Sequence, residues 1–374
     1  MKVALDVSAM PERLAGAGRY VVELTRRLPD YGVDPTLVTR RHDAARWRAL
    51  SPSSKLSSVV PDGRGARLLY EAWSLGSGDA ARTTEVWHGP HYTMPHRGDL
   101  RAVVTIHDLT FFTDPAWHER TKVAFFRRSI TYASRHARVL ICVSDFTSRQ
   151  LDLLLPDHAP VVVAPHGVDL ERFSRSDTGD RDVFASRNLD FDVPYIVFVG
   201  TIEPRKGLDV LLDAFADVAR ADADVELWIA GQDGWGMDAF DALVQAHPAS
   251  RRIRRLGFVD DELLPALLRQ SRAVAYPSRG EGFGLPVLEA MACGALVVTS
   301  ADTVMAEVAG DGATLTKVGD SVALAHALVE TLDLDVAVRA SKAEVARRRA
   351  ETFTWAQSMD RHVAAYEQAR GTLT

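Results

Sequence analysis

The stretch Tyr195-Ile-Val-Phe-Val-Gly-Thr-Ile-Glu-Pro-Arg-Lys-Gly207 places an apolar run, a short polar turn and the start of a helix in direct succession. An unbroken apolar run of this kind is typical of a parallel strand that is buried on both faces. Leu208–Ala219 follow with helical spacing, and four further strand-like runs alternate with helical stretches through residues 226–299. This alternation predicts a complete doubly wound α/β domain, in which ligands bind beyond the carboxyl ends of the strands.

The first half of the chain shows the same alternation. Strands are expected at Lys2–Val7, Leu37–Thr39, Glu85–His88, Ala102–His107, Val139–Val143 and Val161–Ala164, with helices at Gly18–Leu28, Thr121–His136 and Ser144–Leu155. Residues 171–193 are polar, mixed in charge and rich in turn formers, which is typical of a linker. The sequence therefore predicts two Rossmann-like domains, residues 1–170 and 194–353, followed by a helix in the tail, residues 354–374.

Length and composition limit the class of protein. The chain has 374 residues, enough for two domains, and its 47% hydrophobic and 25% charged residues exclude a disordered chain. No apolar run approaches the roughly 20 residues of a membrane-spanning helix, and Asp6 interrupts the region where a signal peptide would be apolar. We therefore expect a cytoplasmic protein. Two cysteines, Cys142 and Cys293, are too few for a disulfide framework or a zinc site of their own.

Charge is distributed unevenly along the chain. The net charge of −6 argues against a nucleic-acid partner, but residues 1–150 contain 22 Lys and Arg against 15 Asp and Glu. Within them, Lys122-Val-Ala-Phe-Phe-Arg-Arg128 mixes cations with aromatic residues on an expected helix. This pattern favours peripheral contact with an anionic membrane or a lipid-linked acceptor. The alternative is a phenylalanine pair in the core beside solvated arginines.

Two glycine-containing turns between a strand and a helix are candidate phosphate sites. Arg205 and Lys206 follow the Tyr195–Gly200 strand, where a forked donor and a point charge together match a diphosphate. The alternative, a solvated surface pair, is disfavoured because the chain has only six lysines. Gly16 and Gly18 would let backbone approach a phosphate before the first helix, although taken alone they are better explained by an ordinary turn.

The most informative local motif is Ser278-Arg-Gly-Glu-Gly-Phe-Gly-Leu-Pro-Val-Leu-Glu289. Gly282 and Gly284 leave backbone amides free ahead of a helix, and a proline follows in its first turn. Glu281 lies in the loop and Glu289 within an apolar helix, so one carboxylate could hold a sugar and the other a ribose. The alternative assigns Glu281 to helix capping and Glu289 to the surface.

In the first half, histidines stand at the ends of two neighbouring strands. His107 ends one strand, and His88 and His91 surround the end of the preceding one. A histidine at this position faces the ligand-binding edge, although a lone histidine is often purely structural. Ser144 and Asp260 start expected helices and are interpreted as N-caps.

Together these stretches resemble the retaining GT-B glycosyltransferases of family 4, over nearly the whole chain. The two glutamates with seven residues between them are the most specific part of the resemblance. It implies two Rossmann-like domains facing a cleft, with the acceptor on the first domain, the nucleotide sugar on the second, and the C-terminal helix packed back on the first. The Glu-Pro-Arg-Lys form of the phosphate loop resembles bacterial mannosyl- and rhamnosyltransferases of surface polysaccharides.

The resemblance also implies roles for individual residues. Arg205 and Lys206 would hold the diphosphate, and Glu281 would contact the hydroxyls of the donor sugar. Glu289 would contact the ribose, and His107 would line the acceptor side of the reacting bond. Backbone would contact phosphate, sugar or base at Gly16, Gly18, Thr201, Gly257, Phe258, Val259, Gly282, Phe283, Gly284 and Leu285. Thr201 is a departure, because many members carry arginine directly after the glycine that ends this strand.

The implied reaction transfers a hexose from a nucleoside-diphosphate sugar, with GDP-mannose favoured, to a glycan or lipid-linked acceptor. No Asp-x-Asp pair follows a strand, so we expect no metal and no cofactor, with Arg205 and Lys206 in the role of a metal ion. Two alternatives remain: a nucleotide-sugar epimerase of the same shape, and a non-catalytic protein that binds sugar nucleotides.

Overall fold

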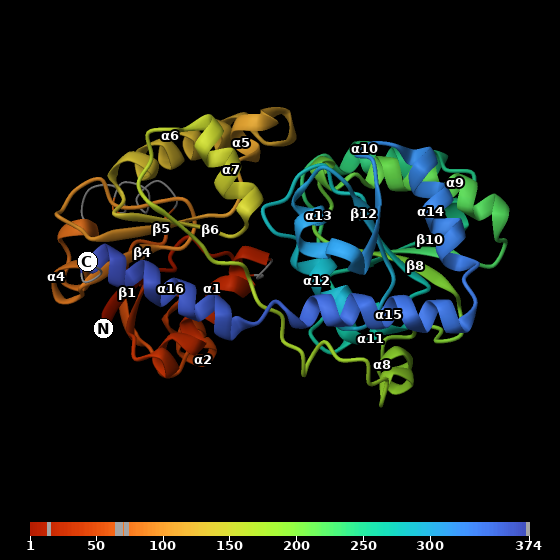
Figure 1. Cartoon of the computed structure of the whole chain (residues 1–374), viewed down its shortest axis with the longest axis horizontal. Helices are drawn as coiled ribbons and strands as arrows, with labels where there is room; N and C mark the ends of the chain where they lie inside the picture. The colour runs from red at the N-terminus through yellow and green to blue at the C-terminus, as the bar shows by residue number, and fades with distance from the viewer. Residues whose placement is uncertain (13–15, 64–69, 71–74, 372–374) are drawn as a thin grey trace. The chain divides into compact units, whose positions relative to one another are not determined.

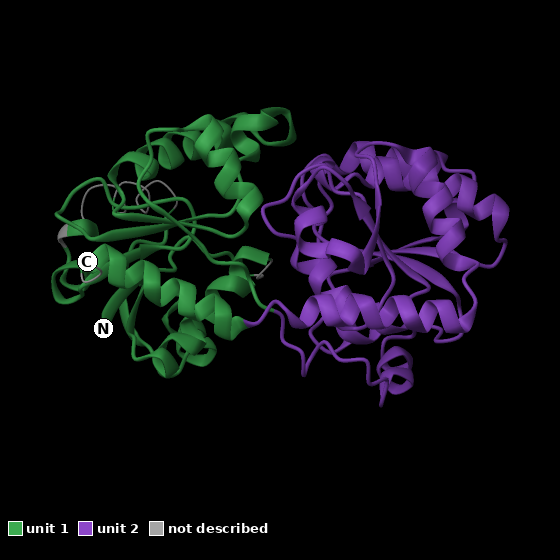
Figure 2. Ribbon diagram, in the orientation of Figure 1, with its two compact units in different colours: residues 1–167, 355–374 green, residues 168–354 purple. Residues whose placement is uncertain are grey.

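The computed structural model describes residues 1–12, 16–63, 70 and 75–371, which form two compact units (Figures 1 and 2). Unit 1 comprises Met1–Gly167 and Trp355–Thr374, and unit 2 comprises Val168–Thr354. The chain therefore leaves unit 1, builds unit 2, and returns to unit 1 with its last helix.

Unit 1 contains a seven-stranded parallel sheet with the order β3-β2-β1-β4-β5-β6-β7. The strands are β1 Lys2–Asp6, β2 Asp34–Arg40, β3 Lys55–Val60, β4 Val86–Gly89, β5 Ala102–Ile106, β6 Val139–Cys142 and β7 Val161–Val163. Helices α1 Gly16–Arg27 and α16 Trp355–Arg370 cover one face, and α5 Thr110–Thr113, α6 Arg120–His136 and α7 Asp145–Leu154 cover the other (Figure 1). Two short helices, α2 Ala44–Leu50 and α4 Asp79–Thr83, also belong to this unit.

Unit 2 contains a six-stranded parallel sheet with the order β10-β9-β8-β11-β12-β13. The strands are β8 Tyr195–Val199, β9 Glu226–Ala230, β10 Ile253–Gly257, β11 Ala273–Tyr276, β12 Val297–Ser300 and β13 Ala313–Thr316. Helices α9 Leu208–Ala221, α10 Met237–Ala246 and α14 Ser321–Leu332 lie on one face, and α8 Asp180–Ser186, α11 Leu263–Gln270, α12 Leu285–Ala292 and α15 Val336–Glu351 on the other (Figure 1). The remaining helix is α13 Val304–Ala309.

These sheets confirm the predicted α/β class with two doubly wound domains. Strands β5, β6, β8 and β11 are buried at every position, as parallel strands covered on both faces must be. Strand order reverses between β1 and β4 in unit 1, and between β8 and β11 in unit 2. In folds of this type, ligands bind at the carboxyl edge beside such a reversal.

Helix α16 completes the core of unit 1. Trp355, Met359 and Tyr366 are buried in one apolar cluster with Val3 and Leu5 of the first strand. Because these side chains come from opposite ends of the chain, the first Rossmann-like unit needs the last helix to close its core.

The segment expected as a linker is instead part of unit 2. Residues 171–193 contain α8, and Asp180 at its start is only 2% exposed. Its carboxylate accepts hydrogen bonds from Arg269 Nε and Gln270 Nε2, both at 2.9 Å. Asp180 therefore joins this segment to α11, while most of its other polar residues are exposed, and that exposed polar composition is what suggested a linker.

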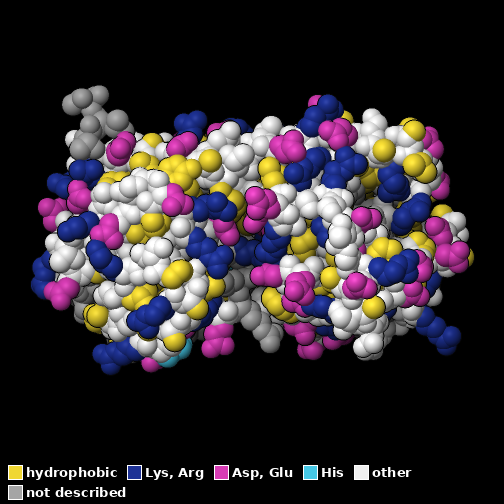
Figure 3. Space-filling view, turned by 90° about the horizontal axis from the view of Figure 1, so that it is seen from below, with side chains coloured by type: hydrophobic (Ala, Val, Ile, Leu, Met, Phe, Trp, Pro, Cys, Tyr) yellow, Lys and Arg dark blue, Asp and Glu magenta, His cyan; other side chains and the backbone are white. Residues whose placement is uncertain are grey.

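Within the described residues, no helix combines the length and apolar character needed to cross a bilayer. On the face drawn in Figure 3, basic side chains lie among acidic ones on each unit and do not form one continuous patch.

Candidate active site

The candidate site of unit 2 is built by the two loops that follow β8 and β11, on either side of the strand reversal. Backbone and side-chain hydrogen bonds join these loops. Arg279 donates from its backbone N to the Arg205 carbonyl at 2.8 Å and from Nη1 to the Pro204 carbonyl at 2.7 Å. Asp209 in turn pairs with the Arg279 guanidinium. The two loops therefore form one rigid framework at the carboxyl edge of the sheet.

Glycine is required where each loop enters its helix. Gly207 has φ +69°, and a Cβ there would lie 2.2 Å from the Pro277 carbonyl oxygen of the other loop. Gly284 has φ +95°, and a Cβ there would lie 2.3 Å from Met305 Cε. Both backbones are left-handed. A side chain at position 207 would push the two loops apart, and one at position 284 would be strained by its φ and would displace the Met305 side chain.

The two loops bring Arg205, Lys206 and Glu281 into one ion-paired cluster, in which Lys206 is buried and the other two are partly buried. Arg205 Nη1 lies 2.8 Å from Glu281 Oε2, and Lys206 Nζ forms an ion pair with Glu281 Oε1. Tyr276, the last residue of β11, accepts a hydrogen bond from Lys206 Nζ at 2.8 Å and donates one to Glu281 Oε1 at 3.0 Å. Sequence reasoning selected the three charged residues but missed the tyrosine, which looked like the apolar end of a strand.

Burial and the neighbouring charges both shift the pKa values of the ionisable groups in this cluster. Lys206 is 7% exposed, and burial followed by the neighbouring Arg205 charge lowers its pKa, while Glu281 counteracts the shift. Burial also raises the pKa of Glu281, but the charges of Arg205 and Lys206 outweigh it and bring that pKa to about 2. The carboxylate is therefore ionised throughout the neutral range. Glu203 Oε2 also pairs with Arg205 Nε at 2.9 Å, so the cluster contains two cations and two carboxylates.

Arg205 and Lys206 lie beside a strand reversal, where ligands bind in this type of fold, and their guanidinium and ammonium groups suit an anionic group such as a diphosphate. Interactions with the forked Arg205 guanidinium and the Lys206 ammonium strengthen as negative charge develops on that group. This arrangement can stabilise a leaving phosphate.

The second glutamate occupies a different environment. Glu289 lies within α12 and is 7% exposed, so the alternative of a free surface role is wrong. The predicted amide positions Gly282, Phe283, Gly284 and Leu285 lead into the N-terminus of α12 and are all buried. A helix N-terminus at this edge adds partial positive charge to the site.

The other residues selected in this half follow strands on the same edge. Thr201 comes two residues after β8, beside the phosphate loop. Gly257 ends β10 with φ +67°, Val259 is buried, and Phe258 leaves 53% of its surface exposed. Asp260, expected as a cap, accepts hydrogen bonds from Glu262 N and Leu263 N at 3.1 and 2.8 Å.

His107 stands directly after β5 at the carboxyl edge of the unit 1 sheet. It is 8% exposed, and its Nε2 donates to the Pro90 carbonyl at 2.8 Å. Burial lowers its pKa, against the opposing effects of Pro90 and Asp108. Its ring meets those of Tyr20 and Tyr92 edge-on at 5.3 and 5.5 Å. His107 is therefore a neutral side chain with a fixed orientation.

Comparisons with known proteins agree with this geometry. A model described as "Glycosyl transferases group 1" matches residues 180–351, and "Glycosyltransferase Family 4" matches residues 14–172. O-antigen chain mannosyltransferase B of Escherichia coli is 30% identical over 98% of this chain and 100% of its own length. The chain is a family 4 glycosyltransferase.

Solved structures show the same fold, GT-B. Sucrose-phosphate synthase from Thermosynechococcus elongatus superposes with a TM-score of 0.80 at 21% identity, covering 99% of each chain. HepE from Anabaena, solved with UDP-glucose, superposes with a TM-score of 0.75 at 20% identity, covering 100% of this chain and 99% of its own. The predicted family and fold are thereby confirmed.

The structure corrects the expected position of Gly16 and Gly18 in unit 1, and it shows which residues of the basic, aromatic segment on α6 are exposed. Gly16 and Gly18 do not lie in a loop ahead of the first helix, because α1 already begins at Gly16 and Gly18 is buried within it.

On α6, Phe126 stacks on Phe111 at 4.6 Å and Arg127 Nε donates to the Phe111 carbonyl. The exposed residues of that segment are Lys122, Ala124, Phe125 and Arg128, and the two cations and Phe125 lie on one face of the helix.

Sequence reasoning missed a buried hydrogen-bond network in unit 1. Tyr20 OH lies 2.9 Å from Thr105 Oγ1 and 2.8 Å from His362 Nε2. His88 contacts Thr105 Oγ1 through Nε2 and the Tyr366 hydroxyl through Nδ1, each at 2.8 Å. The network joins α1, β4, β5 and α16. Its hydrogen-bonded pairs include residues 342 positions apart, so no local signal could have found it.

Proposed function

We propose that this glycosyltransferase moves a hexose, with retention of configuration, from a nucleoside-diphosphate sugar to a glycan or lipid-linked acceptor in cell-surface polysaccharide or glycolipid synthesis. The observation that carries the proposal is the Arg205–Lys206–Glu281 cluster beside the strand reversal of unit 2. GDP-mannose is the favoured donor, because the chain matches an O-antigen mannosyltransferase over its full length. The UDP-glucose bound by HepE supports a nucleotide sugar as the donor class.

In the proposed reaction the bond between the anomeric carbon and the phosphate oxygen breaks, and a bond from the acceptor hydroxyl forms on the same face. The departing phosphate oxygen takes the acceptor proton, so protons and charges balance without a protein nucleophile. Arg205 and Lys206 stabilise the negative charge that grows on the diphosphate, which lowers the barrier because the interaction is strongest in the transition state.

Other side chains position the substrates in this proposal. Glu281 contacts the donor sugar hydroxyls while keeping the two cations in place, and Glu289 holds the ribose. Backbone at Gly257–Val259 lies against the base, and neutral His107 lines the acceptor side of the reacting bond.

The test is a donor panel. The protein is incubated with GDP-, UDP-, ADP- and dTDP-sugars, with and without candidate glycan and lipid-linked acceptors, and nucleoside diphosphate release is measured. Acceptor-dependent release with one donor is the expected result. Formation of an epimer, or donor binding with no turnover for any acceptor, would replace the proposal by one of the two alternatives.

Metal independence is a separate part of the proposal. In the described residues, no group of three or more His, Cys, Asp or Glu side chains is placed to hold a metal ion together. We expect unchanged turnover in EDTA, because Arg205 and Lys206 supply the positive charge. Loss of turnover in EDTA that Mg²⁺ or Mn²⁺ restores would contradict this.

We also propose a cytoplasmic enzyme that associates peripherally with anionic membrane. The exposed face of α6 formed by Lys122, Phe125 and Arg128 supports this, since cations and an aromatic on one helix face favour an anionic interface. Co-sedimentation with anionic vesicles should fall with added salt. Vesicle binding that is independent of both salt concentration and lipid charge would contradict this proposed membrane association.

A further inference from the structure

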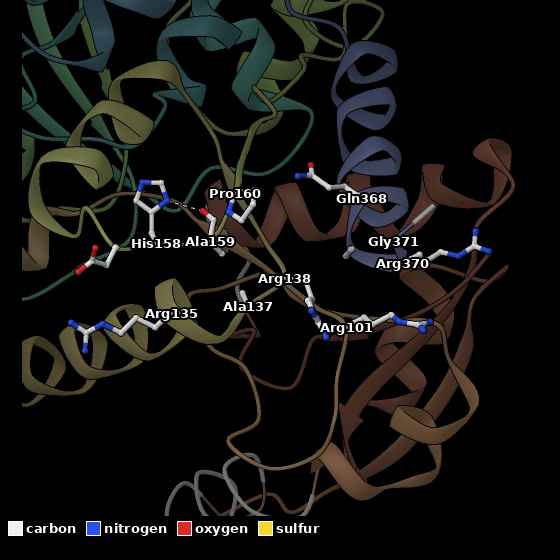
Figure 4. Close-up of a pocket in the computed structure, with 12 residues that line it drawn as sticks. Arg101, Arg135, Ala137, Arg138, His158, Ala159, Pro160, Gln368, Arg370 and Gly371 are labelled. Atoms are coloured by element: carbon white, nitrogen blue, oxygen red, sulfur yellow. Dashed lines mark hydrogen bonds between the residues drawn. The ribbon is translucent and has the colours of Figure 1, made fainter. Parts of the chain in front are cut away.

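Unit 1 has a hollow of about 800 Å³ whose lining is strongly basic (Figure 4). It lies between the end of α6, the segments that lead into β5, β6 and β7, and the end of α16. Its charged lining comprises Arg101, Arg135, Arg138, Arg370 and Asp157. Figure 4 shows Arg101, Arg138 and Arg370 on one side of the hollow, with Arg135 and His158 on the other.

The hollow lies at the amino edge of the unit 1 sheet. Arg101 directly precedes β5 and Arg138 directly precedes β6, and Arg138 N donates to the Ala102 carbonyl at 2.8 Å. In a parallel sheet the amino ends of all strands share one edge, while His107 follows β5 at the opposite edge. Five residues of strand separate the two edges by about 16 Å. The hollow is therefore distinct from the candidate acceptor site.

Most of the positive charge in the hollow is unneutralised. Arg370 pairs with Glu85 at 3.0 Å. In the part of the chain that the structure describes, the guanidinium groups of Arg101, Arg135 and Arg138 form no ion pair or hydrogen bond, and all three side chains are exposed. Asp157 supplies the only acidic side chain of the described lining. Three free cations against one carboxylate leave a net positive hollow in a protein whose overall charge is −6.

We propose that this hollow binds a phosphate or diphosphate group, held chiefly by Arg101 and Arg138. These two arginines lie at the starts of neighbouring paired strands, so their forked donors can engage one tetrahedral anion from two sides. The volume accommodates a phosphate with an attached group. The site depends neither on Arg205 and Lys206 nor on the proposed transfer reaction.

The test uses inorganic pyrophosphate as the probe, titrated by calorimetry at low ionic strength. Because pyrophosphate also fits the proposed donor site, binding is compared in an Arg205→Ser background with and without Arg101→Ser/Arg138→Ser. Removing two charge-assisted partners should weaken pyrophosphate binding by about tenfold or more in that background. The matched control is Arg251→Ser/Arg348→Ser, two exposed arginines of unit 2, which should leave binding unchanged. Equal affinity with and without the two hollow arginines overturns the proposal.

A vesicle experiment distinguishes the sources of the phosphate. Full-length protein and the Arg101→Ser/Arg138→Ser variant are co-sedimented with phosphatidylglycerol or phosphatidylcholine vesicles. If the variant loses binding to phosphatidylglycerol vesicles as well as to pyrophosphate, the ligand is a lipid headgroup. If only pyrophosphate binding falls, the ligand is a soluble phosphate ester. If neither falls, no phosphate site exists here. Thermal unfolding should be unchanged in the variant, because both side chains are exposed.

Discussion

The two units order their strands alike but place different chemistry beside the reversal of that order. In unit 2, Lys206, Glu281 and Tyr276 form a buried ionic cluster next to β8 and β11. In unit 1, Tyr20 and His88 belong to a buried network of neutral groups next to β1 and β4. The order of the strands therefore determines where a site lies. The residues near the ends of those strands determine whether the site contains ionised or neutral groups. Activity should therefore depend on the charges of the unit 2 cluster, and the stability of unit 1 should depend on its histidines remaining unprotonated.

The largest expected effect is the loss of the buried ammonium group in unit 2. Lys206→Met should lower kcat by about 10²- to 10³-fold, the usual cost of removing one preorganised electrostatic partner of a transition state. Acceptor-dependent release of nucleoside diphosphate measures it. Lys317→Met, at an exposed lysine of the same unit, is the control. Wild-type kcat in Lys206→Met would mean that the ionic cluster is structural only.

The two glutamates of unit 2 should fail differently. Glu289→Gln should mainly raise the donor KM, because a ribose contact is nearly equal in ground and transition states. Glu281→Gln should mainly lower kcat, because the transferring sugar loses a charged hydrogen-bond partner whose contact changes during the reaction. Each loss is expected at roughly ten- to a hundredfold.

Calorimetry with nucleoside diphosphate separates the two glutamate roles. The Glu289 variant should bind it poorly and the Glu281 variant almost normally. Equal weakening in both variants, or the reverse order, would show that the pair is misassigned.

Acid should destabilise unit 1 before it affects the ionic cluster of unit 2. Burial lowers the pKa of His362 to about 4, and burial also lowers those of His88, His107 and His166. Since unfolded histidine titrates near pH 6.5, the unfolded chain binds more protons between pH 6.5 and 4, and stability falls as pH drops through that window. His362 alone should cost about 2 kcal/mol by pH 5.

Hydrogen exchange resolved by peptide measures this acid effect in each unit. The pKa of Glu281 is about 2 in the folded protein, below its ordinary value of 4.5. Its stabilising contribution is therefore present above pH 4.5 and is lost as the pH falls from 4.5 toward 2. His362→Gln should reduce the pH slope in unit 1, whereas His326→Gln, at an exposed histidine of unit 2, should not. Faster opening of unit 2 than of unit 1 at pH 5 would reverse the comparison.

The smallest expected effect concerns Tyr276. Tyr276→Phe removes one hydroxyl that bridges Lys206 and Glu281, and should lower kcat by about two- to tenfold with little change in donor KM. Tyr195→Phe loses a comparable buried hydrogen bond, to the Leu267 carbonyl, away from the cluster. It should match the stability loss without the kinetic effect. Equal kinetic losses in both variants would deny Tyr276 a positioning role.

The sequence predicted the central strands well because parallel strands buried on both faces are apolar without interruption. It missed β3 and β13, which lie at sheet edges and carry partly exposed, mixed sequences, Lys55–Val60 and Ala313–Thr316. Residues expected to bind phosphate stood out because charge is unusual directly after an apolar strand. Tyr276 and Tyr20 did not stand out, since aromatic residues in buried elements look like ordinary core, and His88 was noticed only for its place at the end of a strand.

The return of α16 to unit 1 affects the order in which the chain can mature on the ribosome. All of unit 2 is synthesised before Trp355 and Tyr366, which unit 1 needs to close its core. Domains usually fold from the N-terminus during translation. Here unit 2 can fold first, while the apolar core of unit 1 stays exposed until α16 has been synthesised. A chain truncated before Trp355 would contain all of unit 2, together with a unit 1 whose exposed apolar core is prone to aggregation.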